Sequence, residues 1–172
     1  MSASVFDERC AQLENLILPR YDSLPSFGIY VDQLVSFVND TVSFSYMPDE
    51  KPLTASMVNN YVKQGLLPKP NKKKYSQYHI AALIAICILK KIFSIHEIAQ
   101  LIQIQMDAYQ MGQAYDSFID SLERCLAQVF FDKPSKRTGT ASSNSDALLV
   151  ERAVLTFSNK LYVQIKTALL TC

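Results

Sequence analysis

Glycine is scarce in this sequence, which has only four glycines among 172 residues. This scarcity argues against a turn-rich β protein, and the many Leu, Ile, Ala, Gln and Lys residues favour helices. About half of the residues are apolar, so the chain can bury a sizeable core and wholesale disorder is excluded. We therefore expect a mainly all-α fold.

The motifs that mark catalytic and metal sites are also missing. None of the four cysteines belongs to a C-x-x-C pair or lies near a histidine cluster, which argues against structural zinc or a disulfide framework. His79 and His96 are not at metal-ligand spacing, and both are expected to be surface or hydrogen-bonded core residues. There is no Gly-rich phosphate loop and no G-x-S-x-G or H-E-x-x-H motif. We expect no enzyme, no catalytic residues, no cofactor and no metal.

Long hydrophobic runs are absent as well. The longest apolar run covers residues 80–89, which is shorter than the roughly 20 residues that span a bilayer. The first residues include acids and lack a basic region followed by an apolar stretch, so no signal peptide is predicted. The sequence therefore predicts a cytoplasmic protein without a membrane partner.

Acidic residues are missing from one segment in which lysine is concentrated. Residues 51–91 contain eight lysines and no Asp or Glu, whereas residues 1–50 contain eight acids and only two arginines. The rest of the chain is nearly balanced, so this one segment carries the positive excess. Such a segment is typical of a surface that binds a polyanion, although a run of charges can also be only a solvated loop.

Hydrophobic periodicity predicts seven helices. Thr54 is a suitable N-cap and Gly65 a suitable residue after a C-terminus, while Ser94 and Glu97 form a capping-box pattern. The predicted helices cover residues 4–18, 28–40, 54–64, 76–91, 94–105, 107–131 and 146–172.

Three parts of the chain can be proposed from these helices. Residues 1–27 form an N-terminal helix and connector, residues 28–106 form the main domain, and residues 107–172 form a helical pair with a polar linker at 132–145. We expect the last two helices to pack antiparallel across the linker. Their apolar stripes can either form a dimer interface or bury each other within one chain.

The order of motifs between residues 54 and 98 resembles the MerR-type winged helix-turn-helix, within a family of uncharacterised bacterial proteins. In that family a recognition helix runs into a Gly-Leu-Leu-Pro turn, a basic wing and an Arg-x-Tyr-Ser step, and a Phe-Ser-Leu-Glu-Glu-Ile stretch begins the next helix. Here the matching residues are Gly65-Leu66-Leu67-Pro68, then Lys73, Tyr75 and Ser76, then Phe93-Ser94-Ile95-His96-Glu97-Ile98.

This resemblance implies a DNA-binding transcription regulator that acts as a homodimer on double-stranded DNA. Its recognition helix would enter the major groove, and a small β wing at most would contact phosphates. The implied recognition-helix contacts are Thr54, Ser56, Asn59, Asn60 and Lys63, and the implied wing contacts are Lys69, Lys72, Lys73, Lys74 and Tyr75.

Several positions depart from the MerR pattern. Asn59 and Asn60 stand where the family has an Arg-Tyr pair that approaches DNA, the basic wing is shorter than usual, and the link at 41–53 is longer. These departures keep a second hypothesis open, in which the domain is a protein-interaction adaptor that reuses the fold. No effector ligand can be identified from the sequence.

Overall fold

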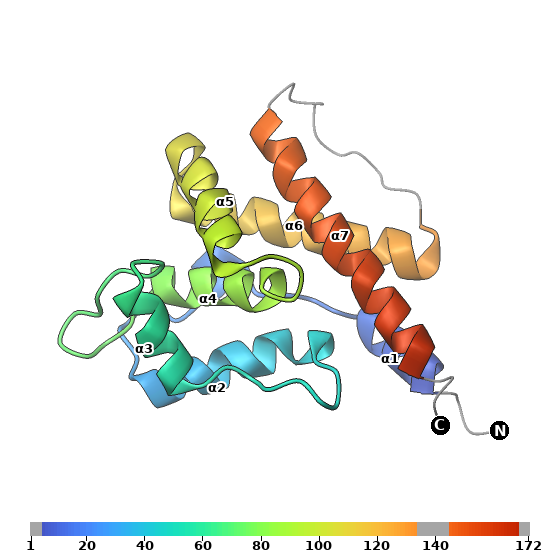
Figure 1. The fold of residues 1–172 in the computed structure, drawn as a ribbon, viewed down its shortest axis with the longest axis horizontal. Helices are drawn as coiled ribbons and strands as arrows, with labels where there is room; N and C mark the ends of the chain where they lie inside the picture. The colour runs from blue at the N-terminus through green and yellow to red at the C-terminus, as the bar shows by residue number, and fades with distance from the viewer. Residues whose placement is uncertain (1–4, 134–144, 169–172) are drawn as a thin grey trace. The chain divides into compact units, whose positions relative to one another are not determined.

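The structure, a computed structural model, describes residues 5–133 and 145–168, and these residues are mostly helical (Figure 1). Within them two isolated β-bridges occur but no strand, which confirms the expectation of an all-α fold. Residues 134–144, which make up most of the predicted polar linker, lie outside the described residues. The elements are α1 (Val5–Glu14), η1 (Tyr21–Ser23), α2 (Val31–Val42), η2 (Ser43–Ser45), α3 (Ala55–Lys63), α4 (Gln77–Leu89), α5 (Ile95–Ala108), α6 (Met111–Phe131) and α7 (Ser145–Ala168).

The chain divides into two compact units. The central unit covers residues 19–116, and the terminal unit combines residues 1–18 with residues 117–172. Helix α6 contributes its first residues to the central unit and the rest to the terminal unit. The divisions proposed from the sequence, after residues 27 and 106, both fall inside the central unit.

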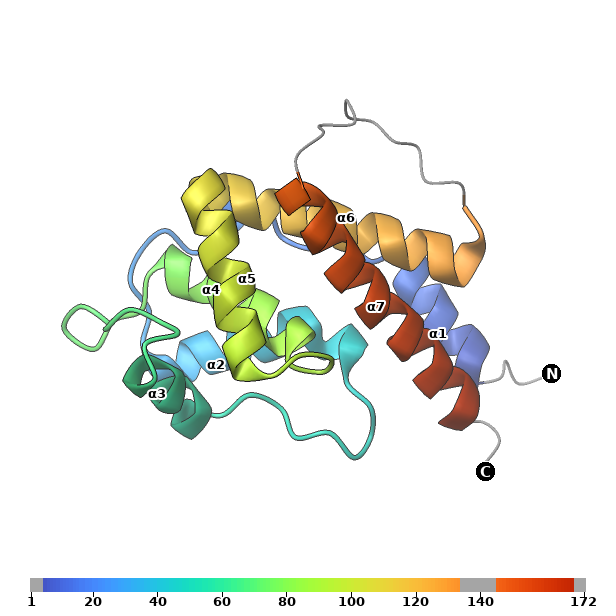
Figure 2. The ribbon, with the colours of Figure 1, turned by 45° about the horizontal axis from the view of Figure 1, so that its top comes forward.

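Helix α4 forms the core of the central unit. Every residue from Ile80 to Leu89 except Ala85 is buried, so α4 is apolar on all sides, as expected of a helix without a solvent face. Helix α2 packs on α4, and α3 packs on α2 (Figures 1 and 2). The side chains that α2 and α3 bury are Leu34, Val38, Val42, Val58 and Tyr61, and each of the four aliphatic ones contributes about 1.5–3 kcal/mol.

The predicted helix caps are confirmed. The Thr54 hydroxyl accepts a hydrogen bond from the Met57 amide at 3.2 Å and begins α3. The Ser94 hydroxyl accepts from the Glu97 amide, and the Glu97 carboxylate accepts from the Ser94 amide at 2.7 Å. Gly65 follows α3 with a φ of +75°, the left-handed conformation that favours glycine after a helix.

Tertiary contacts move some helix ends away from the predicted positions. Helix α1 ends at Glu14, not at residue 18, and the Leu18 amide instead donates to the Glu123 carboxylate at 2.9 Å. Helix α5 continues to Ala108. The next residue, Tyr109, adopts an extended conformation that separates α5 from α6. The predicted joint at residue 106 therefore shifts by a few residues.

In the terminal unit, the stripes proposed for a dimer interface are largely buried within one chain. The Arg124 side chain lies 3.9 Å from Glu151, and the ring centroids of Phe130 and Tyr162 are 5.3 Å apart. The later residue of α6 contacts the later residue of α7, whereas in an antiparallel pair it would contact the earlier one. The prediction of an antiparallel pair was therefore wrong. The connection between them is too long in sequence to impose the tight return of a short helix hairpin. The buried stripe residues are Phe118, Leu122, Cys125, Val154, Phe157, Leu161 and Ile165.

Membrane-spanning segments were searched for in the residues that the structure covers. None of the helices found there has both the length and the apolar character that crossing a bilayer requires.

Candidate nucleic-acid interface

Helix α3 has one polar, exposed face. Ser56, Asn59, Asn60 and Lys63 are exposed on it, and Thr54 is exposed at its N-terminus. The opposite face is held in the core of the central unit. Five of the residues predicted as contacts are therefore brought together on one accessible helix surface.

A two-residue hairpin follows α3 and carries lysines at its tip. The Asn71 amide donates to the Lys74 carbonyl at 3.1 Å, and the Lys74 amide donates to the Asn71 carbonyl at 2.8 Å. Lys72 and Lys73 between them have φ values of 48° and 64°. Positive φ at both central positions is what a type I′ turn requires, and such turns normally use Asn-Gly or Gly-Gly. The hairpin thus holds two exposed lysines in a conformation that costs a non-glycine residue about 1 kcal/mol or more.

The base of the hairpin is fastened to the segment before α2. Tyr75 and Ile29 exchange two backbone hydrogen bonds, at 2.8 and 3.0 Å. Gly28 permits this approach, because a Cβ added there would lie 2.9 Å from the Cβ of Lys74. The Lys74 ammonium lies 5.5 Å from the centroid of the Tyr30 ring. Both views place the hairpin beside α3 and the start of α2 (Figures 1 and 2).

Tyr75 differs from the other predicted contacts because only 4 % of it is exposed. Its hydroxyl donates to the Oδ1 atom of Asn59 at 3.5 Å, which links the hairpin to α3. Burial raises the pKa of the Tyr75 phenol, so the hydroxyl stays protonated and can donate. Tyr75 therefore supports the surface on which the other predicted contacts, including Lys69, are exposed.

His79 is a hydrogen-bonded core histidine that helps to hold the turn after α3. Its Nδ1 atom accepts from the Ser76 amide at 3.0 Å, and its Nε2 atom lies 3.0 Å from the Pro68 carbonyl oxygen. Since Nδ1 accepts, Nε2 carries the proton and donates. Burial lowers the pKa of His79, and the bond to Pro68 opposes this only in part. The neutral imidazole thus ties α4 to the turn after α3.

The boundaries of the central unit agree with a comparison against known protein families. A model of a domain of unknown function, DUF1836, matches residues 19–118, which is more than half of the chain. The chain belongs to the DUF1836 family. The matched region and the central unit, residues 19–116, begin at the same residue and end within two residues of each other. No curated protein and no solved structure matched the chain.

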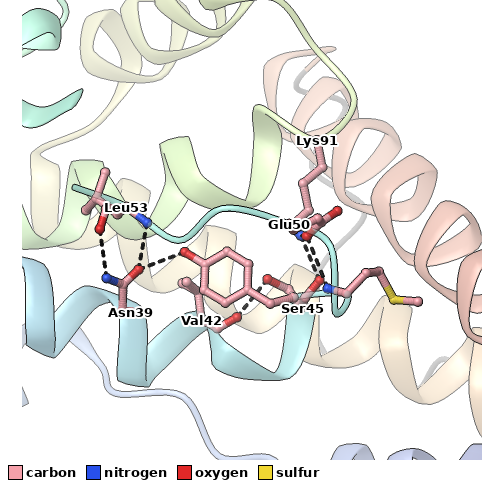
Figure 3. A network of polar contacts seen from close by, with 8 residues as sticks. Asn39, Val42, Ser45, Glu50, Leu53 and Lys91 are labelled. Atoms are coloured by element: carbon pink, nitrogen blue, oxygen red, sulfur yellow. Dashed lines mark hydrogen bonds and ion pairs between the residues drawn. The ribbon is translucent and has the colours of Figure 1, made fainter. Parts of the chain in front are cut away.

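In the DUF1836 domain, a polar network fastens the long link between α2 and α3 (Figure 3). The Asn39 amide donates to the Leu53 carbonyl, and the Leu53 amide donates back to the Asn39 Oδ1 atom, each at 2.9 Å. The Tyr46 hydroxyl donates to the same Oδ1 atom at 2.9 Å. The link is therefore held in place directly before the Thr54 cap that begins α3.

Lys91 is part of this network and not of the exposed basic surface. Its ammonium donates to the Ser45 carbonyl at 2.7 Å, forms an ion pair with Glu50 and lies 4.9 Å from the centroid of the Tyr46 ring (Figure 3). Only 6 % of its side chain is exposed. The sequence count of eight lysines thus overstated the external charge, and no sequence signal paired Lys91 with Glu50. Seven lysines remain to supply the external positive charge: Lys51, Lys63, Lys69, Lys72, Lys73, Lys74 and Lys90.

Other chemistry-bearing groups of the domain are buried or scattered. Burial raises the pKa of the Cys87 thiol to about 11, so it remains protonated, as expected of a small core residue. Across residues 5–133 and 145–168, no three His, Cys, Asp or Glu side chains are grouped so that they could hold a metal ion.

Proposed function

We propose that the DUF1836 domain of this chain binds double-stranded DNA through α3 and the lysine hairpin, and acts as a cytoplasmic transcription regulator. One observation carries the proposal. The exposed polar face of α3 and the exposed lysines at 72–74 lie side by side, linked through Asn59 and Tyr75, in a segment without acidic residues.

The two parts of this surface suit different parts of DNA. A helix that exposes Asn59, Asn60 and Lys63 can offer amides to adenine and an ammonium to guanine or phosphate in the major groove. The hairpin lysines are ammonium groups without base-reading geometry, so they suit phosphates. The helix would recognise the base sequence and the hairpin would supply affinity for the backbone, as in the MerR-like proteins that the sequence resembles.

A homodimer is the DNA-bound form implied by that resemblance. Because the main stripes of α6 and α7 are used inside one chain, a second copy would need another face. Helix α7 still exposes Leu148, Leu149 and Val163. Half-sites about one helical turn apart in selected DNA would support a dimer, and single sites would contradict it.

Selection from random duplex DNA at fixed salt tests the proposal, followed by affinity measurements over a range of salt. Log affinity should fall with log salt by about 0.9 per phosphate contact. Lys72→Ala and Lys73→Ala should weaken binding to all sequences, whereas Asn60→Ala should change the selected sequence. Lys160→Ala, an exposed lysine of the terminal unit, is the matched control. Absent or salt-insensitive binding would contradict the proposal.

A second candidate, a protein-interaction adaptor, is favoured by one contact. The Asn59 Oδ1 atom already accepts from Tyr75, so bidentate pairing of Asn59 with a base must use the second lone pair of that oxygen, in the orientation that Tyr75 holds. In this case α3 would dock on a protein. Recovery of one stoichiometric protein partner without DNA would select the adaptor.

A further inference from the structure

Two large aromatic side chains are exposed in the DUF1836 domain. Phe27 is 71 % exposed and Tyr30 is 56 % exposed. No other Phe or Tyr side chain among the described residues is exposed to this extent. Phenylalanine at this exposure forfeits the free energy of burial, about 1.5–3 kcal/mol for such a side chain. Neither residue belongs to the surface proposed above.

Tyr30 is held next to the lysine hairpin, and Phe27 directly precedes the residues that pack on it. Between them, Ile29 is paired with Tyr75 and Gly28 lies against the side chain of Lys74. The Tyr30 ring lies beneath the Lys74 ammonium. The backbone of Tyr30 is fixed as well, because its amide donates to the Gln33 side chain at 3.0 Å. The Tyr30 ring and the hairpin therefore form one preorganised surface, and Phe27 is exposed one residue before Gly28, which lies against Lys74.

We propose that Phe27 and Tyr30 are additional contacts for duplex DNA, packing against the sugar-phosphate backbone next to the phosphates bound by the hairpin. This inference rests on the proposed DNA binding. Charge selects the occupant, since the lysines at 72–74 would hold a polyanion beside the rings. The Tyr30 hydroxyl can donate to a phosphate, and the Phe27 ring can cover the apolar edge of a deoxyribose.

One nearby charge sets the direction of this contact. Asp32 is exposed in the first turn of α2, two residues after Tyr30. Its carboxylate would repel phosphate, so the DNA backbone passes on the hairpin side of the ring. Asp32→Asn should therefore tighten binding, and it should do so most strongly at low salt.

Salt dependence separates the aromatic contacts from the lysine contacts. Phe27→Ala and Tyr30→Ala should each weaken duplex binding about three- to tenfold with the slope of log affinity against log salt unchanged. Removing a ring releases no counterion, whereas Lys72→Ala or Lys73→Ala should reduce the slope by about 0.9. Tyr30→Phe removes only the hydroxyl, so it distinguishes the contribution of the hydroxyl to binding from that of the ring. Ile17→Ala, an exposed apolar residue of the terminal unit, is the control and should change nothing.

The outcomes distinguish the two proposals. If the unaltered protein does not bind duplex DNA, both are overturned. If it binds and Phe27→Ala and Tyr30→Ala match Ile17→Ala, only the aromatic contact is overturned. Tighter binding to single strands that depends on the rings would make them a stacking platform and overturn the duplex assignment. If the thermal unfolding midpoints of the variants equal that of the unaltered protein, the substitutions act on binding and not on folding. Phe27→Leu is a milder substitution for the same comparison.

Discussion

The Nε2 atom of His79 lies 3.0 Å from the carbonyl oxygen of Pro68 and joins the core helix α4 to the turn that ends α3. The Nδ1 atom of the same ring accepts from the Ser76 amide. A doubly protonated imidazolium cannot accept at Nδ1, so protonation would break the second of these bonds. The cap at the start of α4 therefore depends on a neutral histidine, whereas the bond from Nε2 to the turn does not.

His79 should make stability depend on pH in a definite direction. Its pKa is lowered in the folded chain from an ordinary value of 6.5, so the unfolded chain binds the proton more readily. This contribution is fully present above pH 6.5 and is lost as the pH falls from 6.5 through the lower folded pKa. Denaturant unfolding between pH 7.5 and 5 should show the loss.

Two substitutions test this assignment. His79→Gln can still accept from the Ser76 amide as a capping-box residue, but it does not titrate, so the stability change in this pH range should become smaller. His96→Gln changes an exposed histidine and should keep the dependence of the unaltered protein. An equal effect of the two variants would contradict the role of His79.

Lys91→Met should destabilise the domain by about 2–4 kcal/mol, since it removes the ammonium that neutralises the half-buried Glu50 and donates to the Ser45 carbonyl. Glu50→Gln added to Lys91→Met should recover part of the loss, because no unpaired carboxylate remains. Lys90→Ala, at the neighbouring half-exposed position, should stay within about 0.5 kcal/mol. Urea unfolding of the three variants measures these differences. If Lys91→Met left the free energy of unfolding unchanged, the network would not be what holds the link between α2 and α3.

Lys73→Gly should separate stability from binding. Glycine relieves the positive φ at this position, so the domain should gain about 0.5–1 kcal/mol. At the same time one phosphate contact would be lost, and the salt slope of DNA binding should fall by about 0.9. Lys69→Ala is the comparison, because Lys69 is not among the residues with positive φ; it should lower the slope without the gain. Stabilisation without weaker binding would place Lys73 outside the interface.

Gly28→Ala should destabilise the domain by about 1–3 kcal/mol. The added methyl would lie 2.9 Å from the Cβ of Lys74, which is anchored to the backbone and cannot swing away like a side-chain tip. The hairpin must shift, so DNA affinity should fall with stability. Ser26→Ala, at an exposed neighbouring position, should leave both unchanged. Thermal unfolding and the DNA titration read the two effects.

Local sequence signals predicted the start of α3 and its surface well. A hydroxyl at Thr54 and a glycine at Gly65 act within one helical turn, so their roles can be read without tertiary information. The alternation of buried and exposed residues along α3 follows from its 3.6-residue period in the same way. The direction of α7 relative to α6 was predicted incorrectly, because no local signal sets the crossing of two helices joined by a long connection.

The concentration of lysine in residues 51–91, the helix caps and the all-α class were determined by the sequence itself, because composition and short-range hydrogen bonding act along the chain. Which of those lysines face outward was decided only by the tertiary structure. The buried Lys91 side chain pairs with the half-buried Glu50, some 40 residues away, while Lys72 and Lys73 are turned outward by a hairpin fastened to Ile29. Such partners are brought together by packing on α4, and packing depends on the whole fold and not on sequence distance.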